Sequence, residues 1–562
     1  MITIYQVLPR LFGNKTIAKN IQNGTLNENG SGKMNDFTDA VLSRIKEFGY
    51  SHIWYTGLIE HATQTDYSPL GIAKDHPSVV KGKAGSPYAI KDYYDIDPDL
   101  AEDVPLRMKE FENLVKRTHK AGLKMVIDFV PNHVARQYKS DAKPARTKDL
   151  GATDDTSKAF SPENNFYYIQ GETLHTESFS AQSEVPYDEM PAKATGNNHF
   201  GAWPGVNDWY ETIKLNYGVD YMTNTGVHFN PIPDTWKKMT HILLFWAKKG
   251  VDAFRCDMAE MVPCEFWNYA IKAVKEKYPN IIFIAEVYNP NEYRNYIYHG
   301  GFDYLYDKVG LYDTLRGVVC GYTSASNITG CWQGVDDIHT HMLNFLENHD
   351  EQRIASDFFA KDPIKARPAL VVSACLNTAP LMIYAGQELG ERGMDAEGFS
   401  GCDGRTTIFD YWNVPTLHRL CYEDLSTYPD SEKELYEFYK KIVQLRTESD
   451  AIRCGKFYDL MYANYIGEEG FNPSKQFAFL RKSDTETLLI ICNFDSIKIN
   501  VGVKIPSHAF QFMGLVEGIC NGHDLISGES QTLQLKCDQH TSVEVPAYNA
   551  VILKLDNLKN KS

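Results

Sequence analysis

The sequence predicts an α/β protein built on a (β/α)8 TIM barrel, with an inserted subdomain after strand 3 and a C-terminal all-β sandwich domain. Three observations support this prediction. Up to about residue 450, short apolar segments alternate with amphipathic helical segments. A long stretch rich in Gly, Asn, Asp and aromatic residues follows the third apolar segment. Beyond residue 450 the segments are strand-like and separated by turn residues.

Eight predicted strands share a short apolar run bounded by polar or turn residues: Thr3–Leu8, His52–Thr56, Met125–Val130, Ala253–Asp257, Ile282–Val287, Tyr304–Tyr306, Leu343–Leu346 and Leu381–Ala385. Predicted helices lie between most of them: Asp36–Phe48, Met108–Lys120, Trp236–Lys249, Glu265–Lys277 and Ile364–Leu376. Strands that alternate with helices form a parallel sheet, and eight of them suit a closed barrel. A doubly wound open sheet is the structural alternative, but the charged strand ends favour the barrel.

The predicted domains are a catalytic barrel over residues 1–454 and a β-sandwich over residues 455–562. The barrel includes an inserted subdomain at about 134–228, because a loop of that length in a compact domain is usually functional or a small domain of its own. After the helix Glu432–Arg446, the segments "QFAFLRK", "TLLIICNF" and "AVILKL" are typical of an all-β domain without a clear helix.

Composition excludes some classes of partner. The chain has 562 residues and a net charge of −16, so we expect no nucleic-acid and no anionic-membrane partner. The longest apolar run, at 369–384, is interrupted by polar residues and proline, so no membrane span is expected. The 11 cysteines are scattered without a CxxC pair, and no signal peptide is visible, which predicts a cytoplasmic protein. The oligomeric state stays open.

Charged and polar side chains follow four of the predicted strands where each strand ends. These residues are Asp128, Asn132 and His133, then Arg255 and Asp257, then Glu286, and finally Asn348, His349, Asp350 and Arg353. Any one of them alone is explained by a helix cap, a satisfied core histidine or a turn. In a barrel, however, all these ends meet at one mouth, where chemistry takes place. Together they predict acid–base and nucleophilic chemistry on a neutral polar substrate.

Arg255 and Asp257 stand two residues apart in an apolar strand, so their side chains share one face. Burying charges is costly unless they are paired. The main competing hypothesis is a metal site. However, the sequence shows no HExxH spacing, and an arginine beside the carboxylate would repel a cation. It also shows no Gly-rich phosphate loop and no GxSxG motif.

These segments resemble the conserved regions of the α-amylase family, glycoside hydrolase family 13, along nearly the whole chain. "DFVPNH", "GVDAFRCD", "FIAEV" and "FLENHD" are similar to the family's four main regions, in the same order. "IKLN", at 213–216, is similar to a motif of the inserted domain, and "YAIKD", at 88–92, has the family's Tyr-x-x-x-Asp spacing. The resemblance implies a barrel with an insertion after the third strand, a β-sandwich, and a retaining reaction.

The resemblance also implies a role for each carboxylate. Asp257 would be the nucleophile, Glu286 the acid and then the base, and Asp350 the residue that stabilises the transition state. Arg255 is expected to lower the pKa of Asp257, while an apolar strand and a neighbouring carboxylate keep Glu286 protonated. A retaining reaction predicts that the carboxyl groups of Asp257 and Glu286 lie about 5–5.5 Å apart.

Further residues are expected around these carboxylates. Tyr88 would stack on the bound sugar, and His133 and His349 would hydrogen-bond it. Arg255 and Arg353 complete the expected substrate-binding set, with Arg353 orienting the site from the loop of Asp350. We expect Asp92 and Asp128 to support these residues without contacting the substrate. Asp92 is expected to lie behind Arg255.

Three departures from the family pattern limit what the resemblance implies. Many starch-degrading members carry Lys-His where this chain has Glu260 and Met261, so cleavage inside long starch chains is in question. Ca²⁺ is possible near Asn132 and Asn216, but Lys214 lies close in sequence and could supply the positive charge instead. A second family metal loop, matched by Thr25–Lys33, lacks its aspartates. We therefore expect no required metal and no metal-binding residues.

The function predicted from the resemblance is hydrolysis of α-1,4-glucosidic bonds in maltodextrins and starch-derived oligosaccharides through a covalent glycosyl-enzyme. The first alternative is a 4-α-glucanotransferase acting on the same substrates. A more remote alternative is a non-catalytic carbohydrate-binding protein or transport subunit, which would need no acid at position 286. The preference for 1,4 or 1,6 bonds, exo or endo attack and the preferred substrate length stay open.

Overall fold

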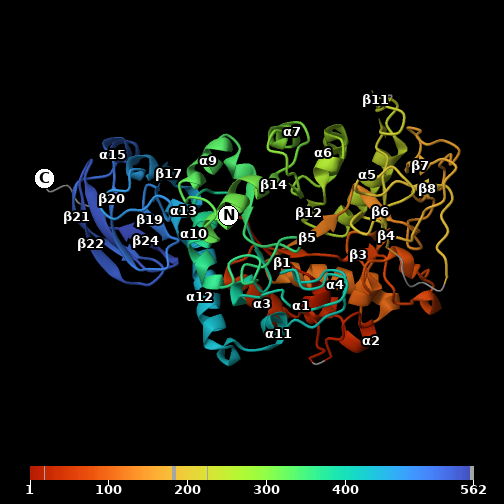
Figure 1. The fold of residues 1–562 in the computed structure, drawn as a ribbon, viewed down its shortest axis with the longest axis horizontal. Coiled ribbons are helices and arrows are strands. Elements are labelled where there is room, and N and C mark those ends of the chain that lie inside the picture. Colours follow the sequence, from red (N-terminus) through yellow and green to blue (C-terminus); the bar gives the residue numbers. More distant parts are fainter. Residues whose placement is uncertain (18, 180–184, 225, 557–562) are drawn as a thin grey trace.

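The computed structural model describes residues 1–17, 19–179, 185–224 and 226–556. At its centre eight parallel strands close into a barrel in the order β1-β16-β15-β14-β13-β12-β5-β2 (Figure 1). They are β1 (Thr3–Val7), β2 (His52–Tyr55), β5 (Lys124–Phe129), β12 (Ala253–Cys256), β13 (Ile282–Ala285), β14 (Tyr304–Tyr306), β15 (Met342–Phe345) and β16 (Leu381–Tyr384). The predicted TIM barrel is confirmed, and the open-sheet alternative is wrong because β1 pairs with both β2 and β16.

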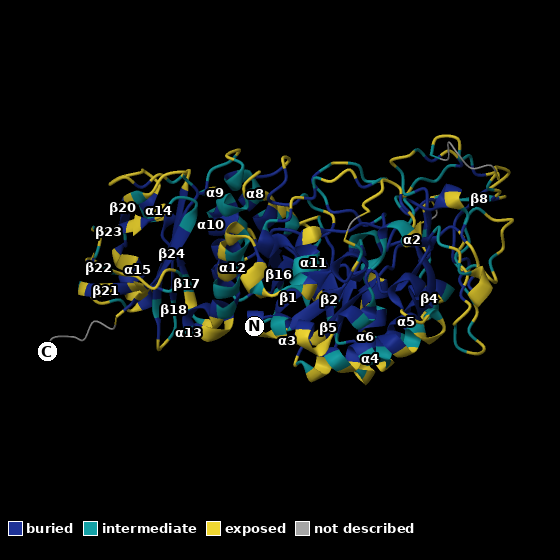
Figure 2. Ribbon diagram, turned by 90° about the horizontal axis from the view of Figure 1, so that it is seen from below, coloured by how far each residue is buried: buried dark blue, intermediate teal, exposed yellow. Residues whose placement is uncertain are grey.

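Helices surround the barrel, and the strands inside them are buried (Figure 2). The longer ones are α3 (Asp39–Phe48), α4 (Arg107–Lys120), α5 (Asp234–Lys248), α6 (Cys264–Lys277), α10 (Arg367–Cys375) and α12 (Asp430–Glu448). The short α7 (Tyr293–Tyr298), α8 (Asp313–Val319) and α9 (Asn327–Gly334) were not predicted. In α8 and α9, glycines and few apolar residues leave too weak a helical period to detect in the sequence.

Sequence signals explain the ends of α3. The Thr38 side chain accepts a hydrogen bond from the Val41 backbone N–H, which caps the first turn. At the other end Gly49 adopts a left-handed conformation with φ 119°, which a residue with a Cβ rarely adopts. The helix buries an apolar stripe that includes Leu42 and Phe48.

Two long segments are inserted after the carboxyl ends of neighbouring barrel strands. After β2 the chain forms an antiparallel pair, β3 (Ile59–His61) with β4 (Ile90–Ile96). After β5 the predicted insertion is confirmed as a set of small antiparallel pairs (Figure 1). These are β6 (His133–Ala135) with β9 (Thr212–Lys214), β7 (Tyr168–Ile169) with β8 (Ala192–Lys193), and β10 (Val219–Asp220) with β11 (Gly226–Val227).

The C-terminal domain lies at the opposite end of the molecule from the insertion (Figure 1). Six strands form one antiparallel sheet in the order β17-β18-β19-β24-β21-β22, and β20 (Ile499–Lys504) pairs with β23 (His540–Val545). The six are β17 (Lys456–Asp459), β18 (Gln476–Lys482), β19 (Thr487–Asn493), β24 (Asn549–Leu555), β21 (Gly518–Asp524) and β22 (Ser530–Leu535). The all-β prediction is confirmed, with two short helices added, α14 (Met461–Asn464) and α15 (Ser507–Met513).

The boundary after residue 454 stays a prediction, and the two domains share buried contacts. Arg481 of β18 donates hydrogen bonds to the carbonyls of Leu376, Ala451 and Ile452. Each of the 11 cysteines is free, while the predicted cytoplasmic location stays a prediction. Within the described ranges, every helix is too short or too polar to cross a lipid bilayer.

Candidate active site

The charged strand ends meet at the carboxyl end of the barrel. Arg255 of β12 stands in register with Asp128 of β5 and with Ile284 of β13, two residues before Glu286. Because the strands are parallel and in register, these side chains reach the same mouth. Only 1% of Arg255 is exposed. A charge this deep needs partners, and the structure supplies them from four segments of the chain.

The Arg255 guanidinium binds the three predicted catalytic carboxylates and one more. Nη1 lies 2.9 Å from Asp257 Oδ1, and Nη2 lies 2.8 Å from Glu286 Oε2. Asp128 Oδ1 is 3.5 Å from Nη1, and Asp350 Oδ2 is 3.9 Å from Nη2. The two terminal nitrogens of one planar group thus hold Asp257 and Glu286 side by side. The 5–5.5 Å separation of these two carboxyl groups stays a prediction.

Aromatic side chains enclose the same guanidinium. The Arg255 carbon Cζ lies 5.2 Å from the ring centroid of Trp54, 5.4 Å from that of Tyr88 and 5.6 Å from that of Tyr306. Arg255 Nε also donates to the Tyr306 hydroxyl at 3.1 Å. Ring faces attract cations and exclude water, so these contacts fix the guanidinium and lower the local dielectric.

Burial dominates the electrostatics of the nucleophile candidate. The pKa of Asp257 is raised, first by burial and then by Glu286, Asp350 and Asp128, while Arg255 opposes the rise. Arg255 lowers this pKa, as expected, but burial and the neighbouring carboxylates outweigh its effect. One arginine shared among several carboxylates cannot neutralise all of them.

Glu286 is held by the loops that follow β12 and β13. Its Oε2 accepts the Met258 backbone N–H at 2.9 Å, and its Oε1 accepts the Tyr288 hydroxyl. Met258 adopts φ 41°, a left-handed conformation that is strained for a residue with a side chain. Glu260 Oε2 in turn accepts the backbone N–H groups of Tyr288 and Asn289, both at 3.0 Å. The position that departs from the family's Lys-His pair therefore anchors the loop beside Glu286.

Tyr88 and His349 form a second, stacked pair at the mouth. Their ring centroids lie 5.1 Å apart, and the Tyr88 hydroxyl is 2.5 Å from His349 Nε2. His349 Nδ1 lies 2.8 Å from the amide nitrogen of Gln6, which leaves the ring proton on Nε2. Asp350 Oδ2 is 3.1 Å from that nitrogen, and its side chain is 43% exposed. Burial lowers the pKa of His349, so this imidazole is neutral.

Asp128 and His133 are two further predicted residues of the site. Asp128 supports the site as expected: its Oδ2 accepts from Trp54 Nε1 at 3.0 Å, and its Oδ1 contacts the Tyr88 hydroxyl at 3.3 Å. His133 is buried and tilted against the Trp209 ring, with centroids 5.2 Å apart. Its pKa is lowered to about 3, chiefly by burial, so it is a neutral hydrogen-bonding group.

The expected role of Asp92 behind Arg255 stays a prediction, and the structure gives its carboxylate other partners. Its carboxylate accepts the backbone N–H groups of Tyr94, Asp141 and Ala142.

The prediction that Arg353 binds the substrate is wrong. Its guanidinium is fully buried, donates to Glu347 Oε2 at 2.8 Å and to Thr406 Oγ1 at 2.9 Å, and covers the Tyr384 ring. Glu347 Oε1 also accepts the Ile354 backbone N–H. Arg353 thus holds the loop that carries Asp350, as the sequence analysis expects, but from beneath it.

Several residues of the mouth were not predicted from the sequence. Arg405 donates from Nε to the Asp350 carbonyl at 2.6 Å, and no motif marks it. Tyr288 could have been found, because it follows Glu286 by two residues and so shares its side of the chain. Beside Asp350 lies a cavity of 340 Å³ that Phe399, Arg405 and Phe409 help to line.

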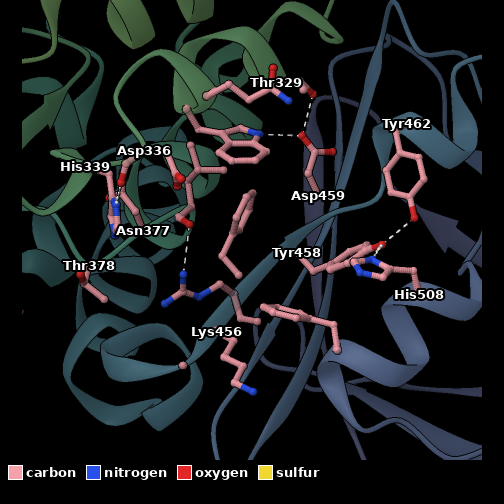
Figure 3. Close-up of a pocket in the computed structure, with 17 residues that line it drawn as sticks. Thr329, Asp336, His339, Asn377, Thr378, Lys456, Tyr458, Asp459, Tyr462 and His508 are labelled. Carbon is pink, nitrogen blue, oxygen red and sulfur yellow. Dashed lines mark hydrogen bonds between the residues drawn. The ribbon is translucent and has the colours of Figure 1, made fainter.

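A larger cavity of 890 Å³ lies elsewhere, between the barrel and the C-terminal domain (Figure 3). There Asp459 accepts hydrogen bonds from Thr329 and from the Trp332 indole, and Tyr458 contacts Tyr462 and His508. Its lining residues do not include Asp257, Glu286 or Asp350, so size alone does not identify the active site.

At the calcium position implied by the resemblance, few oxygen atoms are free to bind a cation. Lys214 Nζ is buried and donates to Asn132 Oδ1 at 2.5 Å. Burial lowers the pKa of Lys214 to about 7. Asn216 Oδ1 accepts the Gly218 backbone N–H at 2.8 Å. The donor set near Asn132 and Asn216 therefore does not suit calcium, and the absence of a required metal stays a prediction.

Comparisons with known proteins agree with this geometry. A family profile described as "Alpha amylase, catalytic domain" matches residues 6–411, and one described as "Alpha amylase, C-terminal all-beta domain" matches residues 471–556. An α-amylase 2 of Dictyoglomus thermophilum is 21% identical over 412 residues, covering 73% of this chain and 58% of that protein. A cyclomaltodextrinase of Bacillus sp is 22% identical, covering 78% and 65%.

Solved structures share the fold over the whole chain. The α-amylase of Geobacillus thermoleovorans, described as complexed with acarbose, has a TM-score of 0.64 at 18% identity, with 99% of both chains covered. By contrast, the chain spans little more than half the length of several curated relatives that it matches. The catalytic profile covers most of the chain and includes every strand end that meets at Arg255, so the chain belongs to the α-amylase family.

Proposed function

We propose that this protein is a retaining glycoside hydrolase that cleaves α-1,4-glucosidic bonds in maltodextrins and related α-glucan oligosaccharides. One observation carries the proposal: Asp257 and Glu286 each bind a terminal nitrogen of the same buried guanidinium, with Asp350 beside them. Retaining glycosidases need two adjacent carboxyl groups, one ionised and one protonated.

In the first step the protonated carboxyl of Glu286 gives its proton to the glycosidic oxygen while the Asp257 carboxylate attacks the anomeric carbon. The bond to the leaving sugar breaks, and an ester bond to Asp257 forms. The Tyr288 hydroxyl and the Met258 N–H bind the two oxygens of Glu286 and orient its carboxyl group. Arg255 holds Asp257 in line for attack, which contributes through positioning.

In the second step Glu286, now ionised, takes a proton from water as the water oxygen attacks the anomeric carbon and releases Asp257. Positive charge develops on the sugar ring in both transition states. Asp350 is exposed toward the mouth and paired with His349, so it is available to bind sugar hydroxyls there. Tyr88 offers the sugar an aromatic ring beside the same histidine.

Two alternatives remain distinguishable. A transferase would use the same glycosyl-enzyme but release it to a sugar hydroxyl instead of water. A non-catalytic binding protein would have no need of the Glu286–Tyr288–Met258 arrangement. The family membership and these contacts favour an enzyme, and the relatives named as amylase and cyclomaltodextrinase support an α-glucan substrate.

Trapping tests the nucleophile directly. A Glu286→Gln variant incubated with an α-maltosyl fluoride should accumulate the ester, because fluoride leaves without an acid but water is not activated. Mass spectrometry of digested protein should then show one glycosyl adduct on the peptide containing Asp257. The control is Asp303→Asn, at the amino end of β14 far from the mouth, which should turn over without accumulating an adduct. An adduct on another residue contradicts the assignment.

A product time course tests substrate and reaction type. Maltoheptaose, pullulan and a cyclodextrin are incubated separately with the wild type. Shorter maltodextrins from maltoheptaose support hydrolysis of α-1,4 bonds, whereas products longer than the substrate indicate transfer. Failure to act on any of the three would overturn the proposed substrate class.

A further inference from the structure

A second group of carboxylates lies outside the active site, where the β3–β4 pair meets the start of the insertion. Glu60 belongs to β3, Asp92 and Asp95 belong to β4, and Asp141 follows β6. One oxygen from each of the four lies within 4.8 Å of the others. Figure 1 shows β3, β4 and β6 side by side on this flank of the barrel, and β4 contacts β6.

Glu60 makes this group unusual. Only 2% of the residue is exposed, and its Oε2 has no hydrogen-bond partner among the described residues. It stands directly opposite Asp92 in the antiparallel register, with irregularities on both sides. Two like charges at a cross-strand pair destabilise a sheet, and an unpaired buried carboxylate costs more. The fold therefore holds an acidic side chain that needs a partner.

The neighbouring cations do not supply that partner. Arg107 binds Asp95, with Nε at 3.0 Å from Oδ2. Lys91 is directed to Asp75, 2.9 Å away, and to the Ala73 carbonyl. Burial and then Asp92 raise the pKa of Glu60 to about 9. Burial also raises the pKa of Asp92 to about 6.

We propose that Glu60, Asp92, Asp95 and Asp141 bind a calcium ion. Oxygens that share one Ca²⁺ at about 2.3–2.6 Å lie within about 5 Å of one another, as these do. Hard, oxygen-only donors exclude the softer transition metals. Mg²⁺ usually keeps several waters and binds one or two carboxylates, whereas Ca²⁺ accepts a protein cage of this size. This site revises the sequence-based expectation of no metal-binding residues.

The ion would join two parts of the chain that approach the active site. β4 begins at Ile90, two residues after Tyr88, and Asp141 lies in the segment that follows His133 and β6. Asp92 already accepts the N–H groups of Asp141 and Ala142. Calcium would add a bridge among the side chains of both segments and stabilise that side of the mouth.

Calorimetric titration of chelator-treated full-length protein with CaCl₂ tests the proposal. Wild type should bind one ion per chain, and its melting temperature should rise with calcium. Glu60→Gln should weaken binding at least tenfold and remove the calcium-dependent shift. Without calcium, the same variant should melt above the wild type, because Gln avoids the cost of burying an acidic side chain that has no partner. A variant that merely disturbed the fold would melt lower.

Asp141→Asn provides a second variant at the exposed member of the group, where folding tolerates the change; it too should bind at least tenfold more weakly. The matched control is Asp103→Asn, an exposed aspartate on the segment after β4 and outside the group, which should bind calcium like the wild type. Three results would overturn the proposal: no calcium binding by the wild type at millimolar concentration, unchanged affinity in both variants, or tighter binding of MgCl₂ than of CaCl₂.

Discussion

The molecule contains two groups of four carboxylates, and it treats their charge in different ways. At the active site, Asp128, Asp257, Glu286 and Asp350 surround the guanidinium of Arg255. In the second group, Glu60, Asp92, Asp95 and Asp141, Arg107 binds Asp95, and one Glu60 oxygen has no hydrogen-bond partner among the described residues. One group has its cation built into the chain, whereas the other would take the proposed calcium ion from solution.

The difference follows from what each group must do. A catalytic pair has to exchange a proton, so its carboxylates need a fixed counter-charge that never leaves and never titrates, which arginine provides. A structural group only needs neutralisation, and a bound ion or a shared proton suffices. The following predictions test this contrast, from the largest expected effect to the smallest.

Asp257→Asn should separate activity from stability. We expect kcat to fall by about 10⁴-fold or more, since the nucleophile is lost. Burial and neighbouring carboxylates raise the pKa of Asp257 in the folded protein. At any pH above the pKa that this residue has in the unfolded chain, it therefore lowers the free energy of unfolding. Removing that charge should raise the melting temperature by about 1–3 °C. Initial rates on maltoheptaose and thermal unfolding measure both effects; a lower melting temperature would contradict the argument.

Arg255→Met should destabilise the fold, in contrast to the stabilisation expected of Asp257→Asn. It leaves several buried carboxylates without their cation, which costs about 3–5 kcal/mol in the free energy of unfolding. Arg255→Lys keeps a charge but cannot bind Asp257 and Glu286 through two parallel nitrogens, so an intermediate loss is expected. Urea unfolding measures the change. Arg405→Met, at a half-exposed arginine of the same mouth, is the control and should stay within about 1 kcal/mol.

The catalytic centre was largely predictable because its residues sit at fixed positions on barrel strands. Arg255 and Asp257 share a face through strand alternation, and parallel register brings Asp128 to the level of Arg255 and Glu286 to that of Asp257. Asp350 follows a predicted strand as well. For these residues local spacing and the barrel geometry together determine the contacts.

Residues on loops and hairpins were not predictable in the same way. The spacing of Tyr88 and Asp92 suggested one shared site, but Asp92 lies on β4 and its carboxylate accepts the backbone N–H groups of Asp141 and Ala142. Arg353 is close to Asp350 in sequence, yet its side chain turns into the core. Glu60 meets Asp92 only through an irregular strand pairing, and Asp141 joins them from a later segment. Long-range pairing of this kind leaves no local pattern in the sequence.

Lys214 is the converse case, a buried cation whose bonded partner, the Asn132 amide, is neutral. Burial lowers its pKa from 10.5 to about 7, so between those values the folded chain binds fewer protons at this position than the unfolded chain. Stability from this residue therefore rises as pH rises through that window. Lys214→Met lacks this dependence. The unfolding free energy of the wild type minus that of the variant should rise by up to about 2.7 kcal/mol between pH 7.5 and pH 9.5.

Urea unfolding of both proteins at the two pH values measures the shift, because other titrating groups contribute equally and cancel. A difference that stays constant with pH would mean that Lys214 remains charged in the folded protein. In that case the lysine would act as a permanent counter-charge, as Arg255 does.

Glu260→Ala should give the smallest effect, on the loop that orients the acid. The change removes the acceptor of the Tyr288 and Asn289 N–H groups, and each hydrogen bond to a charged group is worth about 1–3 kcal/mol. Because the Tyr288 hydroxyl binds Glu286, we expect kcat to fall about tenfold and the alkaline limb of the pH profile, which reports loss of the proton from the acid, to move. Glu260→Gln keeps an acceptor oxygen and should restore most of the rate. If the alanine variant keeps the wild-type pH profile, the loop does not orient Glu286, and the departure from the family's Lys-His pair has no bearing on the acid.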